Sequence, residues 1–513
     1  MFSGEKLQAF NKRLFIIFLI IQPLIELFSD NFGDLFTVAG ISVAVVLRYA
    51  LFLVISVLAI AVNIKTKTAR LFIAFLFVSG IFAVLQYINL KDCNIILYEG
   101  SIQKNILQVI WYAAKYVFAV GAIFLVRLLD FGRKELKTAV LGAAAIVVSV
   151  IVVTNLFNLD YMSYGFGKAD HPEGSILSWF CSDITKDNWR LFTSRGLFLT
   201  GNSLASFLTL TLPVTVYISF KDKSNLTFVL MFFQLVAMLL VSTKVSVFGA
   251  ILLTVITLLI IVFGNIVRKR KFNILKWSIT ALIAVVFSVL FAFSPFSAML
   301  DGIESDFYVE GENDNSALEG LDPDAKIEEI SQEVKLEFVK SNFANQSIPE
   351  QYVYELYDYT EHTDFWFELI RDVDFEKRDT GRKIKVLILE DVVKTKGSVL
   401  DRLVGIGGVS VYPETDISYI YYSTGIFGVF LFLAPFILVL LATIVKILFD
   451  LFKLRFSSLT VVLTLCLGFL LFVSYFAGHT FHLAYIGVFV GVVAGMLNDT
   501  LVNDLKVRRN KND

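Results

Sequence analysis

The sequence predicts an all-α protein that crosses a membrane about twelve times. Of its 513 residues, 56% are hydrophobic and only 18% are charged, whereas about a quarter of the residues in a soluble domain are charged. Long uncharged runs alternate with short charged segments, and the mean hydropathy is +0.71. Because a helix needs about 20 apolar residues to cross the hydrocarbon core of a bilayer, such runs indicate membrane spans.

Twelve runs approach this length. Their bounds are 14–28, 41–62, 71–88, 107–126, 139–157, 197–220, 226–241, 245–263, 277–293, 420–445, 459–476 and 483–497. The first run is short, and only Ser242, Thr243 and Lys244 separate the seventh run from the eighth. Eleven spans therefore remain an alternative.

Basic residues are distributed unevenly between the loops. With a cytoplasmic N-terminus, the inner loops and tails hold 24 Lys and Arg residues, and the short outer loops hold seven. Since cytoplasmic loops are enriched in Lys and Arg, we expect both termini on the cytoplasmic side, which requires an even number of crossings.

A long polar segment, residues 295–419, separates the ninth expected span from the tenth. From Asp301 to Asp416 it contains 28 acidic and 12 basic residues, a composition that cannot lie in lipid. We expect a large extracytoplasmic domain or lid here, with membrane domains at 1–294 and 420–513. Apolar spacing within the segment predicts helices over 322–342 and 383–394.

Composition excludes several other classes of protein. The formal net charge of −1 argues against a generally basic nucleic-acid binder. Three cysteines are too few and too scattered for a disulfide scaffold or a cysteine zinc site. Cys93 and Cys181 are both expected outside and can pair, although their spacing does not require it. No pair of histidines has the HExxH spacing, so we expect no metal site.

Two cations interrupt the expected spans. Arg48 lies in the second span and Lys115 in the fourth, where a charge costs about 2.5–3.5 kcal/mol on insertion scales. At about 1.5 Å per residue, they lie some 10 Å and 12 Å below the outer helix ends. A structural ion pair or a snorkelling side chain is the alternative, but two cations at one depth favour a pocket for an anion.

Further polar groups lie at the outer ends of the spans. Arg190 and Arg195 precede the sixth span, where guanidinium groups and free backbone amides can clamp an anion. A glycine-rich bend after Arg402 leads to Glu414 and Asp416 at the start of an apolar helix. Asp416 can be a helix cap, and partial desolvation would also suit either carboxylate to general-base work.

The order and sidedness of these elements resemble the O-antigen ligase and Wzy-type polysaccharide polymerase family. A first family motif, in which arginine, glycine and phenylalanine precede an asparagine, is similar to Arg195, Gly196, Phe198 and Asn202. A second motif, an arginine followed by two glycine-rich segments around a histidine or glutamate, is similar to Arg382, Gly405, Gly407, Glu414, Gly425, Ile426 and Gly428. Thr243 and Lys244 stand where the family commonly has a Ser–Arg pair, which keeps the charge but loses the forked geometry.

The resemblance implies a GT-C-like membrane glycosyltransferase in the plasma membrane of a bacterium. Such an enzyme transfers glycan from a polyprenyl-diphosphate-linked donor to a sugar hydroxyl of a lipid-linked acceptor on the outer face, with no metal or other cofactor. A chain-length regulator protein is a further partner that the resemblance allows, and nucleic acid is not one. Glu414 stands where the ligase branch has histidine, so polymerase is favoured, with ligase as the alternative.

The resemblance also assigns roles to the polar residues. The expected diphosphate-binding residues are Arg48, Lys115, Arg190, Arg195, Lys244, Arg382 and Arg402. Glu414 is the first choice for the catalytic base, with Asp416 and His479 behind it, while Asn202 and His482 are expected in the substrate groove. A secondary transporter is the strongest rival, since intramembrane cations also mark substrate paths. A receptor role for the acidic domain is a third possibility.

Overall fold

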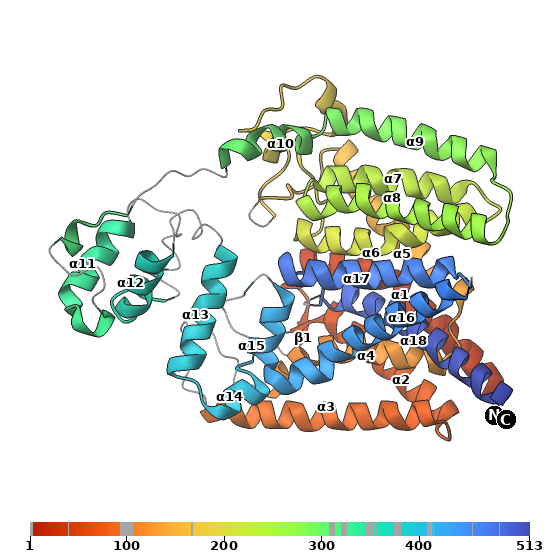
Figure 1. Ribbon diagram of the computed structural model, residues 1–513, viewed down its shortest axis with the longest axis horizontal. Helices are drawn as coiled ribbons and strands as arrows, with labels where there is room; N and C mark the ends of the chain where they lie inside the picture. Colours follow the sequence, from red (N-terminus) through yellow and green to blue (C-terminus); the bar gives the residue numbers. More distant parts are fainter. Residues whose placement is uncertain are drawn as a thin grey trace. The chain divides into compact units, whose positions relative to one another are not determined.

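The computed structural model of the chain is almost entirely helical (Figure 1). It describes residues 4–38, 41–92, 106–165, 168–306, 313–319, 326–343, 353–354, 357–373, 381–407, 413, 415–453, 455–481 and 483–512. Within these ranges the only sheet is an antiparallel pair of two-residue strands, β1 (Thr37–Val38) and β2 (Ile41–Ser42). Two compact units are formed, the first by residues 1–80, 113–301 and 431–513, the second by 81–112 and 302–430.

A helix overlaps each of the twelve expected spans, and the structure confirms an all-α polytopic membrane protein. Ten helices in the described ranges are long and apolar enough to cross a membrane, counting α15 and α16 as one. They are α1 (Gly4–Phe32), α2 (Val43–Asn63), α3 (Lys67–Asp92), α5 (Arg133–Leu156), α6 (Gly201–Lys221), α8 (Lys244–Val267), α9 (Ile274–Ala292), α15 (Asp416–Gly428) with α16 (Ala434–Phe452), α17 (Ser458–Phe476) and α18 (Ala484–Asn512). The other two expected spans correspond to α4 (Ile106–Leu128) and to the 16-residue α7 (Leu226–Val241).

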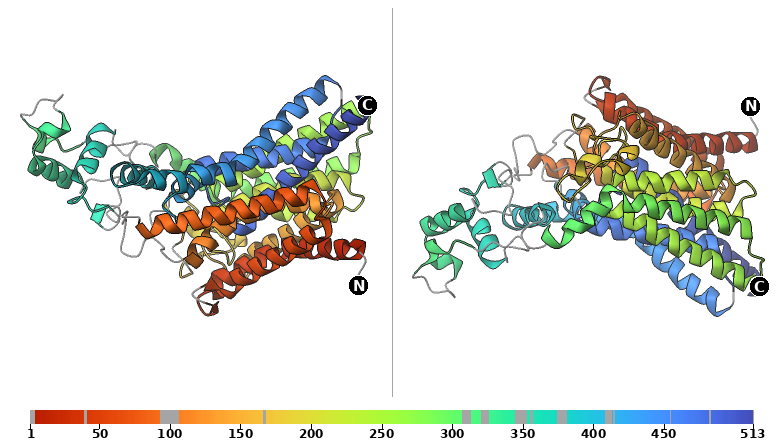
Figure 2. Two further views of the ribbon diagram at one scale, coloured as in Figure 1. Left: turned by 90° about the horizontal axis from the view of Figure 1, so that it is seen from below. Right: turned by 90° about the horizontal axis from the view of Figure 1, so that it is seen from above.

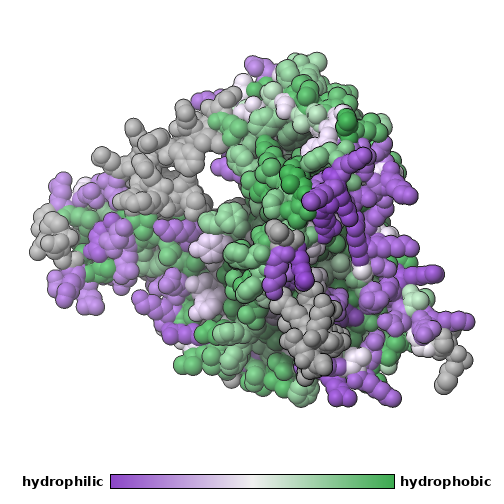
Figure 3. Space-filling view, turned by 45° about the vertical axis from the view of Figure 1, so that its right-hand side comes forward, coloured by the Kyte–Doolittle hydropathy of each residue, from purple (hydrophilic) through white to green (hydrophobic). Residues whose placement is uncertain are grey.

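The basic loops of the first unit meet at one end of its helices. Lys12 donates to the carbonyl of Asp130 at 2.7 Å, and Lys137 pairs with Asp222 at 2.5 Å. Lys276 donates to the carbonyl of Ser219 at 2.8 Å, and Arg268 to that of Phe456. Both chain termini lie at this end (Figures 1 and 2), and in Figure 3 hydrophilic side chains gather there beside hydrophobic helix sides. These contacts therefore join loops that the sequence predicts on one side.

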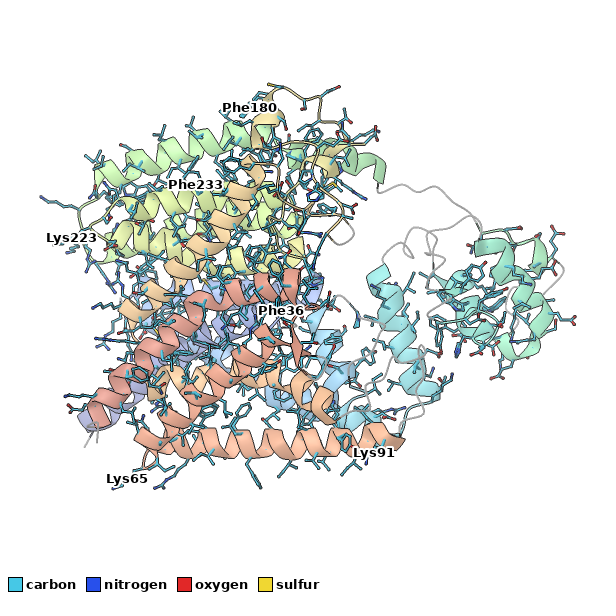
Figure 4. The ribbon with its side chains drawn as sticks, turned by 180° about the vertical axis from the view of Figure 1, so that it is seen from behind. Phe36, Lys65, Lys91, Phe180, Lys223 and Phe233 are labelled. Atoms are coloured by element: carbon cyan, nitrogen blue, oxygen red, sulfur yellow. The ribbon has the colours of Figure 1, made fainter. Side chains whose placement is uncertain are left out.

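Figure 4 shows the two ends of the first unit through labelled side chains. Lys65 and Lys223 lie at the basic end, and Phe36 and Phe180 lie at the opposite end. That opposite end carries the irregular segment 157–200, whose short helices are η1 (Ile176–Phe180) and η2 (Trp189–Phe192). Cys181 follows η1 and is exposed, whereas Cys93 lies outside the described residues.

Helix α6 is the core of the first unit. Almost all of its residues from Gly201 to Ser219 are buried, and it packs against α5, α7, α8 and α17. Its hydroxyl groups bond carbonyls one turn earlier, as Thr209 does to Ala205 at 2.7 Å and Thr215 to Thr211 at 3.0 Å. Because these polar side chains are satisfied within the helix, α6 tolerates full burial.

The second unit has a hydrophobic core of its own. Its helices are α11 (Gln332–Phe343), α12 (Thr363–Asp372), α13 (Gly381–Thr395), α14 (Val399–Val404) and α15, with short turns η3 (Ser316–Leu318) and η4 (Ile327–Glu329). Phe338, Trp366 and Ile388 from three of these helices are fully buried together, and the Trp366 indole donates to the carbonyl of Tyr357 at 2.8 Å. Helices α11 and α13 confirm the expected helical stretches, although α11 begins at Gln332.

Two elements lie where the chain passes from one unit to the other. Helix α10 (Pro295–Asp306) follows α9, and the π-helix Val429–Leu433 joins α15 to α16. Most of the expected extracytoplasmic segment 295–419 belongs to the second unit, which also includes residues 81–112. Its placement outside the cell stays a prediction.

Candidate functional site

The loop before α6 holds Arg195 in a fixed backbone. The amide of Arg195 donates to the carbonyl of Tyr161 at 2.9 Å, and the amide of Tyr161 donates back to Gly196 at 2.8 Å. The preceding residue, Ser194, donates its amide to the carbonyl of Leu240 in α7 at 2.7 Å. The loop is therefore bonded on both sides, and Arg195 is presented from a rigid support.

Gly196 and Phe198 explain the spacing of the first motif. Gly196 has a φ of +60°, and a Cβ there would lie 3.1 Å from the Cα of Ile151 in α5, so only glycine fits without strain. Phe198 is 1% exposed and anchors the loop in the apolar interior. Arg195 is thus held where the chain turns into α6.

The last turn of α1 is bonded to the same loop. Asp30 accepts from the amide of Leu199 at 3.2 Å, and the Asn31 side chain donates to the carbonyl of Leu197 at 2.9 Å. The Tyr161 hydroxyl donates to the Asn31 amide oxygen at 3.0 Å. Helix α1 therefore brings a carboxylate to the loop that carries Arg195.

Carboxylates and burial both act on Arg195. Its guanidinium donates to the carbonyl of Gly165 at 3.2 Å and interacts electrostatically with Asp170, Asp30 and Tyr161. Burial lowers the pKa of Arg195 below its ordinary value, and these three groups act in the opposite direction. Since arginine keeps its proton in proteins, the site has a buried, permanently positive group beside two acids.

Arg48 lies one layer deeper and has an acidic partner. Its Nη2 atom is 2.5 Å from the Glu26 Oε2 atom, and both side chains are almost fully buried. Glu26 is one helical turn before Asp30 on α1, and both Glu26 and Arg48 interact electrostatically with Asp30. The expected depth of Arg48 is compatible with these contacts, but its first partner is a protein carboxylate.

The turn before α18 adds hydroxyl groups to this cluster. His479 has a φ of +62° and is half-buried, and the hydroxyl of the buried Thr480 bonds Ser206 of α6 at 3.4 Å. Tyr485, in the first turn of α18, is buried and interacts electrostatically with Glu26, Asp30 and Arg48. His479 therefore belongs to a turn that is tied to the first helical turns of α6.

Lys115 has a different neighbour from that of Arg48. The ring of Phe118, one turn after Lys115, contacts Tyr49 and Phe52 of α2 with centroid distances of 4.8 Å and 4.3 Å. Lys115 is 8% exposed, and its ammonium group lies 5.0 Å from the centroid of the Tyr116 ring. That the two cations share a depth in the membrane stays a prediction.

Three other expected site residues of the first unit lie near its surface. Arg190 is exposed, with its guanidinium 5.8 Å from the Tyr164 ring and 5.6 Å from the Trp189 ring. Lys244 is exposed at the first residue of α8, and Asn202 is half-buried in the first turn of α6. At these positions a ligand can reach the side chains, and their roles stay predictions.

In the second unit the glycine-rich segments of the second motif cross each other. The amides of Ile406 and Gly407 donate to the carbonyls of Tyr422 and Ser423 at 2.9 Å and 3.1 Å. Gly425 breaks α15 with a φ of +64°, and a Cβ there would lie 2.5 Å from the carbonyl of Leu403. The motif therefore specifies a close backbone crossing beside a broken helix.

Two amide side chains of α3 hold this crossing. Gln86 donates to the carbonyls of Val404 and Ser423 at 2.8 Å and 2.6 Å. Asn89, one turn later, donates to the Asp401 carboxylate at 2.8 Å and to the carbonyl of Gly405 at 3.2 Å. The carbonyl groups near the break in α15 are thereby satisfied by side chains of α3 and by the amides of Ile406 and Gly407, which follow α14.

The other expected residues of the second unit have separate positions. Asp416 is fully buried at the first residue of α15, and Arg402 is exposed on α14. Arg382 is in α13, but its side chain is outside the described part of the structure. Glu414 and His482 also lie outside the described residues. Their predicted roles stay predictions.

A family model described as an O-antigen ligase like membrane protein matches residues 8–504. The chain belongs to this O-antigen ligase-like family. No curated protein and no solved structure matches the chain. Family membership indicates a multi-pass membrane enzyme that transfers glycan and works on lipid-linked sugars.

Sequence reasoning about this O-antigen ligase-like protein missed the acids of the site. Glu26, Asp30 and Asp170 lie around Arg48 and Arg195, and none of them was among the expected site residues. The available signal was the spacing of Glu26 and Asp30, four residues apart at the end of the first apolar run, which places both on one helix face. Within the described ranges, no three potential metal ligands are grouped.

Proposed function

We propose that this O-antigen ligase-like protein is a polysaccharide polymerase. It transfers glycan from a polyprenyl-diphosphate-linked donor to a sugar hydroxyl of a lipid-linked acceptor on the outer face of a bacterial plasma membrane. The observation that carries the proposal is the buried Arg195 guanidinium, fixed in the family's first motif beside Asp30 and Asp170.

The leaving group of this reaction explains a buried arginine. When the glycosidic bond to diphosphate breaks, negative charge grows on the departing phosphate oxygens. A guanidinium in a site without bulk water stabilises that charge more strongly than it would in solution. Arg195 can do this without reorganisation because its amide donates to Tyr161 and the carbonyl of the next residue, Gly196, accepts from Tyr161.

Exposed cations of the first unit are proposed to bind the substrate first. Arg190 and Lys244 are exposed and can meet phosphate before it reaches Arg195. Arg48 is paired with Glu26, so the pair adds little net charge to the inner layer. Lys115, Arg382 and Arg402 stay proposed diphosphate contacts. No metal or other cofactor is proposed.

The test replaces Arg195 in the native host. Arg195→Ala and Arg195→Lys are compared with Arg70→Ala, a matched control that removes an exposed arginine of α3 in the first unit. We expect loss of long surface glycan and accumulation of single lipid-linked repeat units for Arg195→Ala, partial activity for Arg195→Lys, and normal glycan for the control. Unchanged chain-length ladders in Arg195→Ala at normal protein level would refute the polymerase.

A ligase is the second candidate function, favoured by the description of the matching family model. The same Arg195 variant strains distinguish a ligase from a polymerase. A defective ligase leaves long glycan on the lipid carrier and removes it from the final acceptor, whereas a defective polymerase leaves only single repeat units.

A further inference from the structure

The carboxylate of Asp30 has an environment that the proposed diphosphate contacts do not explain. It lies in the last turn of α1, is half-buried, and interacts electrostatically with Arg195, Arg48, Lys168 and Glu26. An acid beside the cation that holds an anionic leaving group would weaken binding unless it has a task of its own. We propose that Asp30, in place of Glu414, is the catalytic base that takes the proton from the attacking sugar hydroxyl.

One carboxylate oxygen of Asp30 is held by a hydrogen bond, and the other can accept a proton. Oδ2 accepts from the amide of Leu199 at 3.2 Å. No other hydrogen bond to Asp30 occurs among the residues that the structure describes, so Oδ1 is available to accept a proton. The bond to Leu199 also orients the carboxylate, because Leu199 belongs to the loop that carries Arg195.

The cations around Asp30 leave it without a direct ion pair. Arg48, which interacts electrostatically with Asp30, is engaged by Glu26 at 2.5 Å. Across the described part of the chain, no Lys, Arg or His nitrogen comes within 4.0 Å of the Asp30 oxygens. A carboxylate that is not neutralised by a salt bridge keeps its capacity to accept a proton.

Asp30, the proposed base, and Arg195, the proposed leaving-group contact, are both held by the loop before α6. Leu199 follows Arg195 by four residues, and Asn31 of α1 donates to the carbonyl of Leu197 at 2.9 Å. Asp30 and Arg195 therefore move together, as two groups that act on the same anomeric centre must.

The step balances without another reactant. The acceptor hydroxyl gives its proton to Asp30 Oδ1 as its oxygen bonds the anomeric carbon. The bond from that carbon to the phosphate oxygen breaks, and its electron pair leaves with the diphosphate, which Arg195 stabilises. Protonated Asp30 then loses its proton to water. This inference rests on the proposed glycan transfer and adds the identity of its base.

The experiment uses membrane vesicles from a native host that lacks this chain and has accumulated lipid-linked glycan. Purified full-length protein is added, and initial transfer rates are measured between about pH 5 and pH 8, the range in which a carboxylate base gives an acidic limb. Binding of undecaprenyl diphosphate is measured in parallel, because it reports on the leaving-group site alone. The variants are Asp30→Asn, Asp30→Glu and the matched control Asp34→Asn, which alters an exposed acid four residues later.

We expect Asp30→Asn to lose about 100-fold or more in rate, to lose the acidic limb of its pH profile, and to bind undecaprenyl diphosphate at least as tightly as the wild type. Asp30→Glu retains part of the rate with a shifted acidic limb, which supports the inference even if Asp30→Asn does not fold. Asp34→Asn behaves as the wild type.

Three outcomes would overturn the inference. The first is a wild-type rate and pH profile in Asp30→Asn, which would leave the proposed function intact. The second is an equal loss of rate and of undecaprenyl diphosphate binding with an unchanged pH profile, which would make Asp30 a binding residue. The third is a wild-type protein that neither transfers glycan nor binds undecaprenyl diphosphate, in which case the proposed function fails as well.

Discussion

The Arg48 guanidinium in α2 donates to the Glu26 carboxylate in α1 over 2.5 Å, and the two side chains are 5% and 11% exposed. This pair joins the first two helices of the chain at the level of the polar cluster. The pair also affects the expected role of Arg48. A cation with a buried carboxylate partner attracts an anionic substrate only weakly, because the pair has little net charge.

Removing one member of this pair is expected to destabilise the protein strongly. Glu26→Gln or Arg48→Met alone leaves an uncompensated buried charge, at a cost of about 3–5 kcal/mol. The double variant has no such charge and should recover most of the loss. Thermal unfolding of the detergent-solubilised protein measures this. If the double variant is as unstable as the sum of the single variants, the pair is not coupled.

Glycine at the crossing of α14 and α15 is expected to be indispensable. Gly425→Ala places a Cβ 2.5 Å from the Leu403 carbonyl and 2.6 Å from the Gly405 amide at a φ of +64°, and Gly405→Ala overlaps the backbone of Ser423. Both variants should reduce folded protein severely. Gly80→Ala is the control, because no atom lies within 4 Å of its added Cβ. Normal yield and melting temperature of Gly425→Ala would contradict this crossing.

Thr243 is expected to act as a helix cap and not as a substrate contact. Its hydroxyl accepts from the amide of Ser246 at 3.1 Å, and the Thr243 amide donates to the hydroxyl of Ser246 at 3.0 Å. Thr243→Ala should cost about 0.5–2 kcal/mol of stability, and Thr243→Ser should cost little. Lys223→Ala, which alters an exposed side chain in the loop before α7, should leave the melting temperature unchanged. A stable Thr243→Ala variant would argue against the capping role.

The fold could be predicted because membrane spans depend on local composition. Each of the twelve apolar runs overlaps a helix, and the basic loops meet at one end through contacts such as Lys137 with Asp222. Both results follow from the thickness of the bilayer and from the distribution of Lys and Arg, which are properties of short segments. The break of α15 at Gly425 is not predicted, because residues 420–445 are expected to form one span, and only the contact with the Leu403 carbonyl explains the break.

The site could be predicted only in part because it depends on which segments meet. Arg195 stands out within its motif, but the acids around it come from α1 and from residue 170, distant in sequence. Arg48 looks like an anion ligand until Glu26 is seen beside it. A charged side chain in an apolar run predicts that a polar partner exists. Only the packing of α1 on α2 shows which residue that partner is.

The His362 ring in the second unit stacks on Tyr357, with ring centroids 3.6 Å apart and planes 8° from parallel. The Tyr357 hydroxyl donates to Asp391 at 2.5 Å, so this stack joins the start of α12 to α13. Burial, and then the nearby Lys396, lower the pKa of His362 from its ordinary value of 6.5, while Asp391, Glu361 and Asp358 oppose them. The folded state therefore favours the neutral ring.

A neutral His362 makes the stability of α12 depend on pH. Because the unfolded chain binds the proton more readily, the stabilisation is complete above about pH 6.5 and declines as the pH falls below that value. We expect the free energy of opening of α12 amides, from hydrogen exchange of the full chain corrected for the intrinsic rate, to decrease from neutral to mildly acidic pH. His362→Phe keeps a stacked ring without a titrating group and should remove this dependence. If His362→Phe shows the same acid sensitivity as the wild type, another group carries it.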